Sequence, residues 1–170
     1  GRAGGPRDGG FADGPALEAR FSAPCGMVKM GDGALIIADG RNSRIRKLQN
    51  GVVTTLAGED FDWNDEDEET LRDGPGATAR FGCPVGLTLD AQERLLVCDF
   101  ENHRIRRVTS EGETTTIGGA AGPRIEGNPH GIMVAKDGAV IVSEVIATHR
   151  ISTLSADGTM TTLAGNAERG

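Results

Sequence analysis

Two side chains with metal-binding chemistry stand at matching places in this sequence. Cys25 and His130 each precede a glycine that opens a short apolar segment, and Val85 holds the same place between them. Thiolate and imidazole groups are ligands for zinc, copper and related metals. We therefore consider a metal site at Cys25 and His130, with His130 as a candidate acid–base group. Two ligands fall short of the three that catalytic zinc sites use, so a second copy would have to supply more. The simpler interpretation is that His130 is a polar residue lining the central channel.

An acidic segment, residues 59–69, contains eight acidic side chains and no basic one. Asp60, Asp62 and Asn64 alternate as in a calcium-binding loop, but the sixth position is not glycine and Leu71 occupies the twelfth, so the pattern argues against calcium. A solvated run of charge with two aromatic side chains is better suited to contact a protein partner. The candidate partner-binding residues are Phe61, Trp63, Asp65 and Glu66.

The overall charge argues against nucleic acid as a partner. Eighteen basic and 25 acidic residues give −7, and the body outside the acidic segment is nearly neutral, without a dominant basic footprint. RNA binding through an arginine-bearing face stays an alternative, because basic residues cluster at two places that correspond to each other. They are Arg41, Arg44, Arg46 and Lys47, and Arg104, Arg106 and Arg107.

Membrane and disulfide classes are disfavoured by the same sequence. No apolar run approaches the ~18 residues of a membrane-spanning helix, and residues 1–5 lack the apolar core of a signal peptide. The three cysteines are far apart and form no Cys-x-x-Cys pair, which argues against a disulfide scaffold or a structural zinc site. The sequence does not determine the compartment, but the cysteine pattern favours a reducing, intracellular setting.

An internal repeat organises the chain. A shift of 60 residues aligns the first copy with the second, and a third copy starts about 45 residues later. Each copy contains a Pro-x-Gly start, a turn, an apolar run that ends in an acid, a polar hairpin and a threonine-rich end. The apolar runs are 35–38, 95–98 and 140–143, and the acids that end them are Asp39, Asp99 and Glu144.

These features predict four short antiparallel strands per copy and an all-β fold. First strands are expected at 26–30, 86–90 and 131–135, and the apolar runs are expected to be second strands buried on both faces. Third strands are expected around Ile45, Ile105 and Ile151, and fourth strands end at glycine. Stacked four-stranded sheets of this kind form a β-propeller.

The pattern Asp-x-x-Asn-x-Arg-Ile-Arg, at 39–46 and again at 99–106, resembles the NHL repeat. The resemblance spans roughly residues 8–165 and implies a β-propeller of four-stranded blades, three in this chain. It implies little about activity, since members of the family include RNA binders, protein-binding modules and a few lyases. The signature residues are Asp39, Asn42, Arg44, Asp99, Asn102, Arg104, Glu144 and Arg150.

The signature residues are interpreted as structural. Asp and Asn stabilise tight turns, and we expect Arg44 and Arg104 to pair with the aspartates across their hairpins. In the third copy Glu144 replaces aspartate and Thr148 stands near the asparagine position, so its hairpin is expected to differ.

The chain divides into 1–58 (linker and blade 1), 59–119 (acidic segment, linker and blade 2) and 120–170 (blade 3 and tail). Closed propellers have 4–8 blades, so three would leave two apolar blade faces uncovered. The prediction is a non-catalytic, protein-binding scaffold whose ring is completed by a second copy, as half of a six-bladed ring, or by the rest of a longer chain. The alternatives are a metal-assisted lyase or hydrolase at the central channel, and RNA binding. No cofactor is predicted beyond that channel metal.

Overall fold

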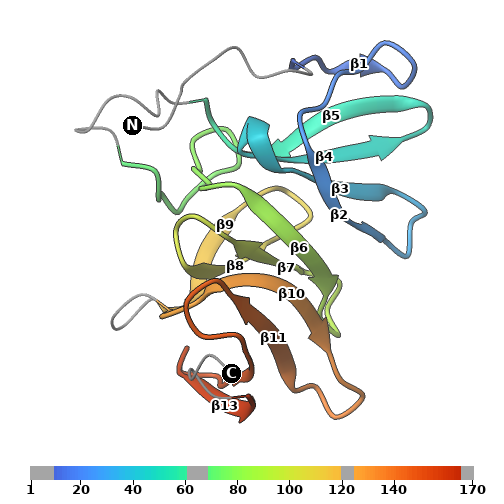
Figure 1. Ribbon diagram of the computed structural model, residues 1–170. Helices are drawn as coiled ribbons and strands as arrows, with labels where there is room; N and C mark the ends of the chain where they lie inside the picture. Colours follow the sequence, from blue (N-terminus) through green and yellow to red (C-terminus); the bar gives the residue numbers. More distant parts are fainter. Residues whose placement is uncertain (1–9, 61–68, 120–124, 166–170) are drawn as a thin grey trace.

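The computed structural model describes residues 10–60, 69–119 and 125–165, which form three antiparallel sheets lying side by side (Figure 1). We call them blades 1, 2 and 3. Blade 1 contains β1 (Gly14–Pro15), β2 (Pro24–Lys29), β3 (Leu35–Asp39), a 3-10 turn (Gly40–Asn42), β4 (Arg44–Gln49) and β5 (Val52–Ala57). Blade 2 contains β6 (Pro84–Leu89), β7 (Leu95–Asp99), β8 (Arg104–Val108) and β9 (Thr114–Gly118). Blade 3 contains β10 (Asn128–Val134), β11 (Val140–Val145), β12 (Arg150–Leu154) and β13 (Met160–Ala164).

The predicted all-β architecture is confirmed, with two differences in detail. Blade 1 has a fifth strand, because Gly14 and Pro15 pair with Val53 and Val52 of β5. These two residues belong to the segment before β2, which we call the linker of blade 1; the linker of blade 2 is the corresponding segment before β6. The first strands also start earlier than expected. In blade 1 the pairing of β2 with β3 continues past a bulge, so the strand already begins at Pro24.

The first strands of the blades run side by side, with β6 between β2 and β10 (Figure 1). Their backbones come close enough that a Cβ at Gly26 would overlap the carbonyl oxygen of Val85. A Cβ at Gly86 would overlap the carbonyl oxygen of His130 in the same way. The glycine of each Pro-x-Gly start therefore allows the next blade to approach.

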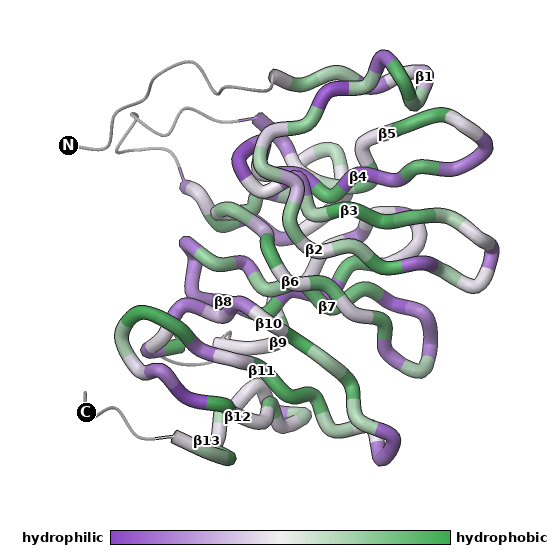
Figure 2. The backbone as a smooth tube through the Cα atoms, turned by 45° about the vertical axis from the view of Figure 1, so that its right-hand side comes forward, coloured by the Kyte–Doolittle hydropathy of each residue, from purple (hydrophilic) through white to green (hydrophobic). Residues whose placement is uncertain are grey.

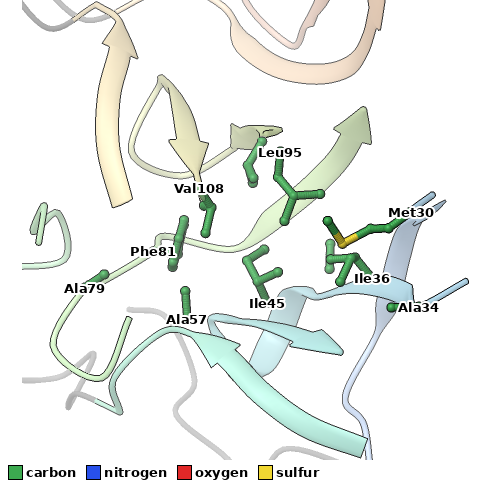
Figure 3. Close-up of a cluster of buried hydrophobic side chains, with 11 residues drawn as sticks. Met30, Ala34, Ile36, Ile45, Ala57, Ala79, Phe81, Leu95 and Val108 are labelled. Atoms are coloured by element: carbon green, nitrogen blue, oxygen red, sulfur yellow. The ribbon is translucent and has the colours of Figure 1, made fainter. Parts of the chain in front are cut away.

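Two apolar cores fill the spaces between the blades. The core between blades 1 and 2 includes Ile36, Ile45 and Ala57 on one side and Phe81 and Val97 on the other (Figure 3). The core between blades 2 and 3 is formed in the same way and includes Cys98, Ile105 and Val142, all fully buried.

The second strands differ in burial from blade to blade. All of β7, which has a blade on each side, is buried, as the sequence predicts. β3 is buried from Ile36 to Asp39, whereas β11, which packs against blade 2 on one side, is only partly buried. Figure 2 shows apolar positions along β3 and β7 and polar positions in the turns that join strands. No helix in the described ranges has the length and apolar character needed to cross a bilayer.

Candidate functional site

The residues that precede the first-strand glycines lie at the starts of β2, β6 and β10. Cys25 is exposed, and its Sγ donates a hydrogen bond to the carbonyl oxygen of Ala23 at 3.2 Å. Desolvation by the surrounding chain and the charge of Asp39 raise the pKa of the Cys25 thiol, which disfavours the thiolate needed to bind a metal. Val85 is buried, so only Cys25 and His130 present polar groups at these places.

His130 is exposed on blade 3, and its ring meets that of Phe100 from blade 2 edge-on, with centroids 6.2 Å apart. In the part of the chain that the structure describes, no three His, Cys, Asp or Glu side chains are grouped to hold a metal ion. A channel metal at Cys25 and His130 therefore stays a prediction that requires ligands from outside the described residues.

Arg46 of blade 1 is fully buried. Its guanidinium donates to Asp39 at 2.7 Å and to Asp13 of the linker at 2.6 Å. The rings of Phe11 and Phe21 lie against it, with centroids 4.7 and 4.8 Å from the guanidinium carbon. Arg46 thus joins the linker to the hairpin through charge-assisted hydrogen bonds and cation–π contacts.

Blade 2 repeats this cluster around Arg106. The guanidinium donates to Asp99 at 2.7 Å and to Asp73 at 2.8 Å, and the ring of Phe81 lies 4.9 Å from it. Burial raises the pKa of the Asp99 carboxyl, and the positive charge of Arg106 opposes that rise. Since the two side chains are fully buried, they hold the blade together and are not free to bind a ligand.

The sequence predicted that Arg44 and Arg104 pair with the aspartates across their hairpins, and this prediction is wrong. The Arg44 guanidinium donates to the carbonyl oxygen of Asn42 at 2.8 Å, and that of Arg104 donates to the carbonyl oxygen of His103 at 3.1 Å. The aspartates instead bind the arginine two residues further along. The linker explains this choice, because it supplies a second carboxylate that the hairpin sequence alone does not reveal.

The signature asparagines connect the hairpins to the segments that precede the blades. Asn42 donates to the carboxylate of Asp39 at 2.8 Å and to the carbonyl oxygen of Gly10 at 3.0 Å. Asn102 makes the matching bonds to Asp99 and to the carbonyl oxygen of Thr70, both at 2.9 Å. Their geometry serves the turn and the linker, in agreement with a structural role.

Blade 3 reaches a similar arrangement with different residues. The Glu144 carboxylate accepts a hydrogen bond from Arg150 at 3.0 Å, and also accepts from the hydroxyls of Ser152 and Thr148. Ser152 stands where the buried arginine of the other blades stands, and Thr148 takes the asparagine place. Burial opposes the charged form of Glu144, but the hydrogen bonds outweigh it and hold the pKa of this carboxyl below its usual value.

Acid should loosen blade 3 through Glu144. Because its folded-state pKa lies below the unfolded value, Glu144 contributes stability above the unfolded pKa and loses it as pH falls through the folded value. We expect melting temperature to fall more steeply in wild type than in Glu144→Gln below the ordinary glutamate pKa of 4.5. Thermal melts over a pH series measure this, with Glu126→Gln, an exposed neighbour of Arg150, as the control. Equal slopes for all three proteins would contradict it.

The acidic-segment candidates Phe61, Trp63, Asp65 and Glu66 lie outside the described residues. The described residues on either side of them are held in place. Glu59 accepts hydrogen bonds from Arg72 and Arg80, and Arg80 also donates to the carbonyl oxygen of Glu69 at 3.1 Å. Both described flanks of the segment therefore lie at the linker between blades 1 and 2, and its partner-binding role stays a prediction.

The outer side of blade 3 exposes positions that are buried or partly buried in the other blades. Ile151 is 37% exposed, whereas Ile45 and Ile105, which pair with β3 and β7 at the same register, are fully buried. Leu163 is 60% exposed, although its counterparts Leu56 and Ile117 pack against the interblade cores. We call this surface the blade 3 side.

On blade 1, apolar side chains are exposed on the face that is turned away from blade 2. Met27, opposite Ile37 on β3, is 62% exposed, while its counterparts Leu87 and Ile132 pack into the two interblade cores. Phe21 is only half-buried, whereas its counterpart Phe81 is fully buried. We call this surface the blade 1 side. Sequence reasoning predicted two uncovered blade faces, and the structure identifies the side chains on them.

The sequence and the fold were compared with those of known proteins, and the matches are to repeat and propeller proteins. The NHL repeat profile matches residues 81–108, which run from Phe81 through β8. The chain contains an NHL repeat. Its sequence is similar to NHL repeat-containing protein 2 of Bos taurus, at 27% identity over 154 residues, and to Protein SUPPRESSOR OF QUENCHING 1, chloroplastic, of Arabidopsis thaliana, at 31% over 111 residues. The two matches cover 81% and 64% of this chain, but only 21% and 10% of the relatives.

The three blades match part of solved six-bladed propellers. A streptogramin B lyase matches with a TM-score of 0.60 at 18% identity, covering 85% of this chain and 43% of the lyase. A gluconolactonase from Xanthomonas campestris matches with a TM-score of 0.64 at 21% identity, covering 96% of this chain and 60% of that enzyme. At such identities the likeness establishes the fold and does not transfer an activity.

Proposed function

We propose that this chain is a non-catalytic propeller scaffold that binds protein through the blade 1 side and the blade 3 side. The observation that carries the proposal is the change in burial along the repeat. Ile151 is exposed although its counterparts Ile45 and Ile105 are fully buried, and Leu163 and Met27 are exposed although their counterparts pack, partly buried, against the two interblade cores. Apolar side chains exposed on one face in this way are typical of a protein-binding surface.

The chemistry of the partner surface follows from the two interfaces inside the chain. Each interblade core joins the later side of one blade to the earlier side of the next, with apolar side chains from both. The blade 3 side therefore fits the earlier side of a propeller blade, and the blade 1 side fits the later side. Such blades can come from another copy or from a longer chain.

RNA binding through the arginine-bearing face has less support. Arg46 and Arg106 are fully buried and already paired with carboxylates, so their guanidinium groups do not face solvent. Arg44 is buried as well and donates to the carbonyl oxygen of Asn42. Phosphate contacts need accessible basic groups, and three of the seven basic residues in that alternative do not provide them.

Photo-cross-linking tests the scaffold proposal. A photoreactive phenylalanine derivative replaces Ile151 in the whole chain, which is then irradiated alone and in an extract of the source cells. We expect an adduct whose peptide comes from the apolar strands of a propeller blade. The control position is Leu17, which is fully exposed and whose counterpart in blade 2, Ala77, stays exposed beside blade 1. Absence of any polypeptide adduct at position 151, or equal adducts at 17, would overturn the proposal.

A further inference from the structure

The inference below rests on the proposed function and names the partner. We propose that a second copy of this chain covers both open sides, so that two copies close head-to-tail into one ring of six blades. The blade 3 side of each copy packs on the blade 1 side of the other, and the same interface is formed twice.

Gly131 is the backbone observation that points to a propeller blade on the blade 3 side. Gly26 and Gly86 occupy the matching places in blades 1 and 2, where a Cβ would overlap a carbonyl oxygen of the next blade's first strand. At Gly131 a Cβ would meet only the Ser143 side chain of its own blade. The glycine thus leaves room for a strand, and none of the described residues outside blade 3 lies there.

The repeat predicts which strand fills that room. The carbonyl oxygens that approach Gly26 and Gly86 belong to Val85 and His130, and the residue that corresponds to them in blade 1 is Cys25. In the proposed pair, the carbonyl oxygen of Cys25 of the second copy lies over Gly131. The blade 1 side of the second copy therefore supplies both the carbonyl oxygen over Gly131 and the apolar side chains that cover the blade 3 side.

The side chains of the two open sides are opposite halves of a single kind of interface. Ile151 and Leu163 correspond to residues that pack toward the next blade, and Met27 and Phe21 to residues that pack toward the previous one. A second copy supplies each missing half with the side-chain types already used inside the chain. Both open sides are buried by one partner, whereas an unrelated partner would have to reproduce two different surfaces.

The number of blades makes closure after two copies possible. Three blades are described here, and the solved propellers that the chain matches have six. A head-to-tail contact either closes into a ring or continues as an open filament, depending on the rotation between copies. If the rotation from blade to blade is that of a six-bladed ring, the second copy supplies the remaining three blades and leaves no side uncovered.

Light scattering on a sizing column measures the mass of the purified whole chain and of three variants. Wild type should elute at twice the 17.7 kDa chain mass. Ile151→Glu and Met27→Glu each place a charge in both interfaces, and both should shift the mass to 17.7 kDa while circular dichroism retains the β signal. Leu17→Glu adds the same charge outside the interface and should remain a dimer.

A monomeric wild type at every concentration up to about 100 µM, a concentration at which a micromolar complex would be almost fully formed, would overturn the second-copy proposal. So would a dimer that neither Ile151→Glu nor Met27→Glu weakens. Neither result would remove the scaffold proposal, because a cross-link from position 151 to another protein's propeller blade would still stand. If no cross-link formed either, both proposals would fail together. If either Ile151→Glu or Met27→Glu does not fold, the remaining variant still tests the proposal, because every interface contains one blade 3 side and one blade 1 side.

Discussion

Replacing Arg106 by methionine is expected to lower the free energy of unfolding by about 3–5 kcal/mol, the usual cost of removing one partner of a buried ion pair. The substitution leaves the Asp99 carboxylate buried, with hydrogen bonds from Asn102 and the Gly82 N–H but without its cation. It also removes the contacts to Asp73 and to the carbonyl oxygens of Arg72 and Arg80, which attach the linker to blade 2.

Denaturant unfolding measures this loss, and Arg107→Met is the matched control. Arg107 is the next residue on β8, points to the opposite face and is only half-buried, so its loss should cost under about 1 kcal/mol. A loss from Arg106→Met as small as that from Arg107→Met would contradict the role given to the buried cluster.

The penalty of Arg106→Met should shrink in acid. Burial raises the pKa of Asp99, and removal of the opposing cation raises it further. A carboxyl with a raised folded-state pKa is favourable to the folded state below the unfolded pKa, and that contribution is lost as pH rises through the folded value. The difference in stability between wild type and variant should therefore be larger at pH 7 than at about pH 4.

Replacing Gly86 by alanine is expected to lower the free energy of unfolding by about 1–3 kcal/mol, as overpacking of a filled interior does. The new methyl group would overlap the His130 carbonyl oxygen and lie 3.3 Å from the Cys98 sulfur, so β6 and β10 would have to separate. Because the clash is with backbone, a change of rotamer cannot relieve it. Denaturant unfolding of the variant measures the loss.

Gly131→Ala is the control for Gly86→Ala, and it also reports on the open side. In a monomeric Met27→Glu background it should cost less than Gly86→Ala, since the methyl group would meet the Ser143 side chain, 2.9 Å from its hydroxyl, and no backbone atom of another blade. In the wild-type background the same change should weaken the dimer. Equal losses of stability from Gly86→Ala and Gly131→Ala, both made in the Met27→Glu background, would show that the blade-to-blade contact at Gly86 does not matter.

The sequence was sufficient to predict the blades because their signals are local. Each strand is a short apolar or threonine-rich run between turn residues, and the repeat multiplies the signal. The fifth strand, β1, was not predicted, since a two-residue linker segment has no strand pattern and pairs only because the edge of β5 is available. The choice of Arg46 over Arg44 was missed for a similar reason, because it depends on Asp13, 33 residues away in the sequence.

The side chains that are exposed on the blade 1 side and the blade 3 side could be identified only from the structure. Ile45, Ile105 and Ile151 each follow an arginine at the same register, and the sequence does not reveal that the third is exposed while the first two are fully buried. Cys25 and Cys83 are 58 residues apart in the sequence, and the sequence does not reveal that folding brings them near each other at the boundary of blades 1 and 2. Burial, and next the nearby Cys25, raise the pKa of the Cys83 thiol to about 11, so it is not a ready nucleophile.

The most direct test of the assembly is oxidative cross-linking of Val145→Cys. Phe100 lies against His130 where blades 2 and 3 meet, and Val145 and Cys25 are the corresponding residues on the two open sides. In a closed pair, the new thiol should form a disulfide with Cys25 of the second copy, and Cys25→Ser should abolish it. A non-reducing gel should show a covalent dimer of twice 17.7 kDa and nothing larger. A chain that stays monomeric, or a ladder of ever larger species, would contradict a ring closed by two copies.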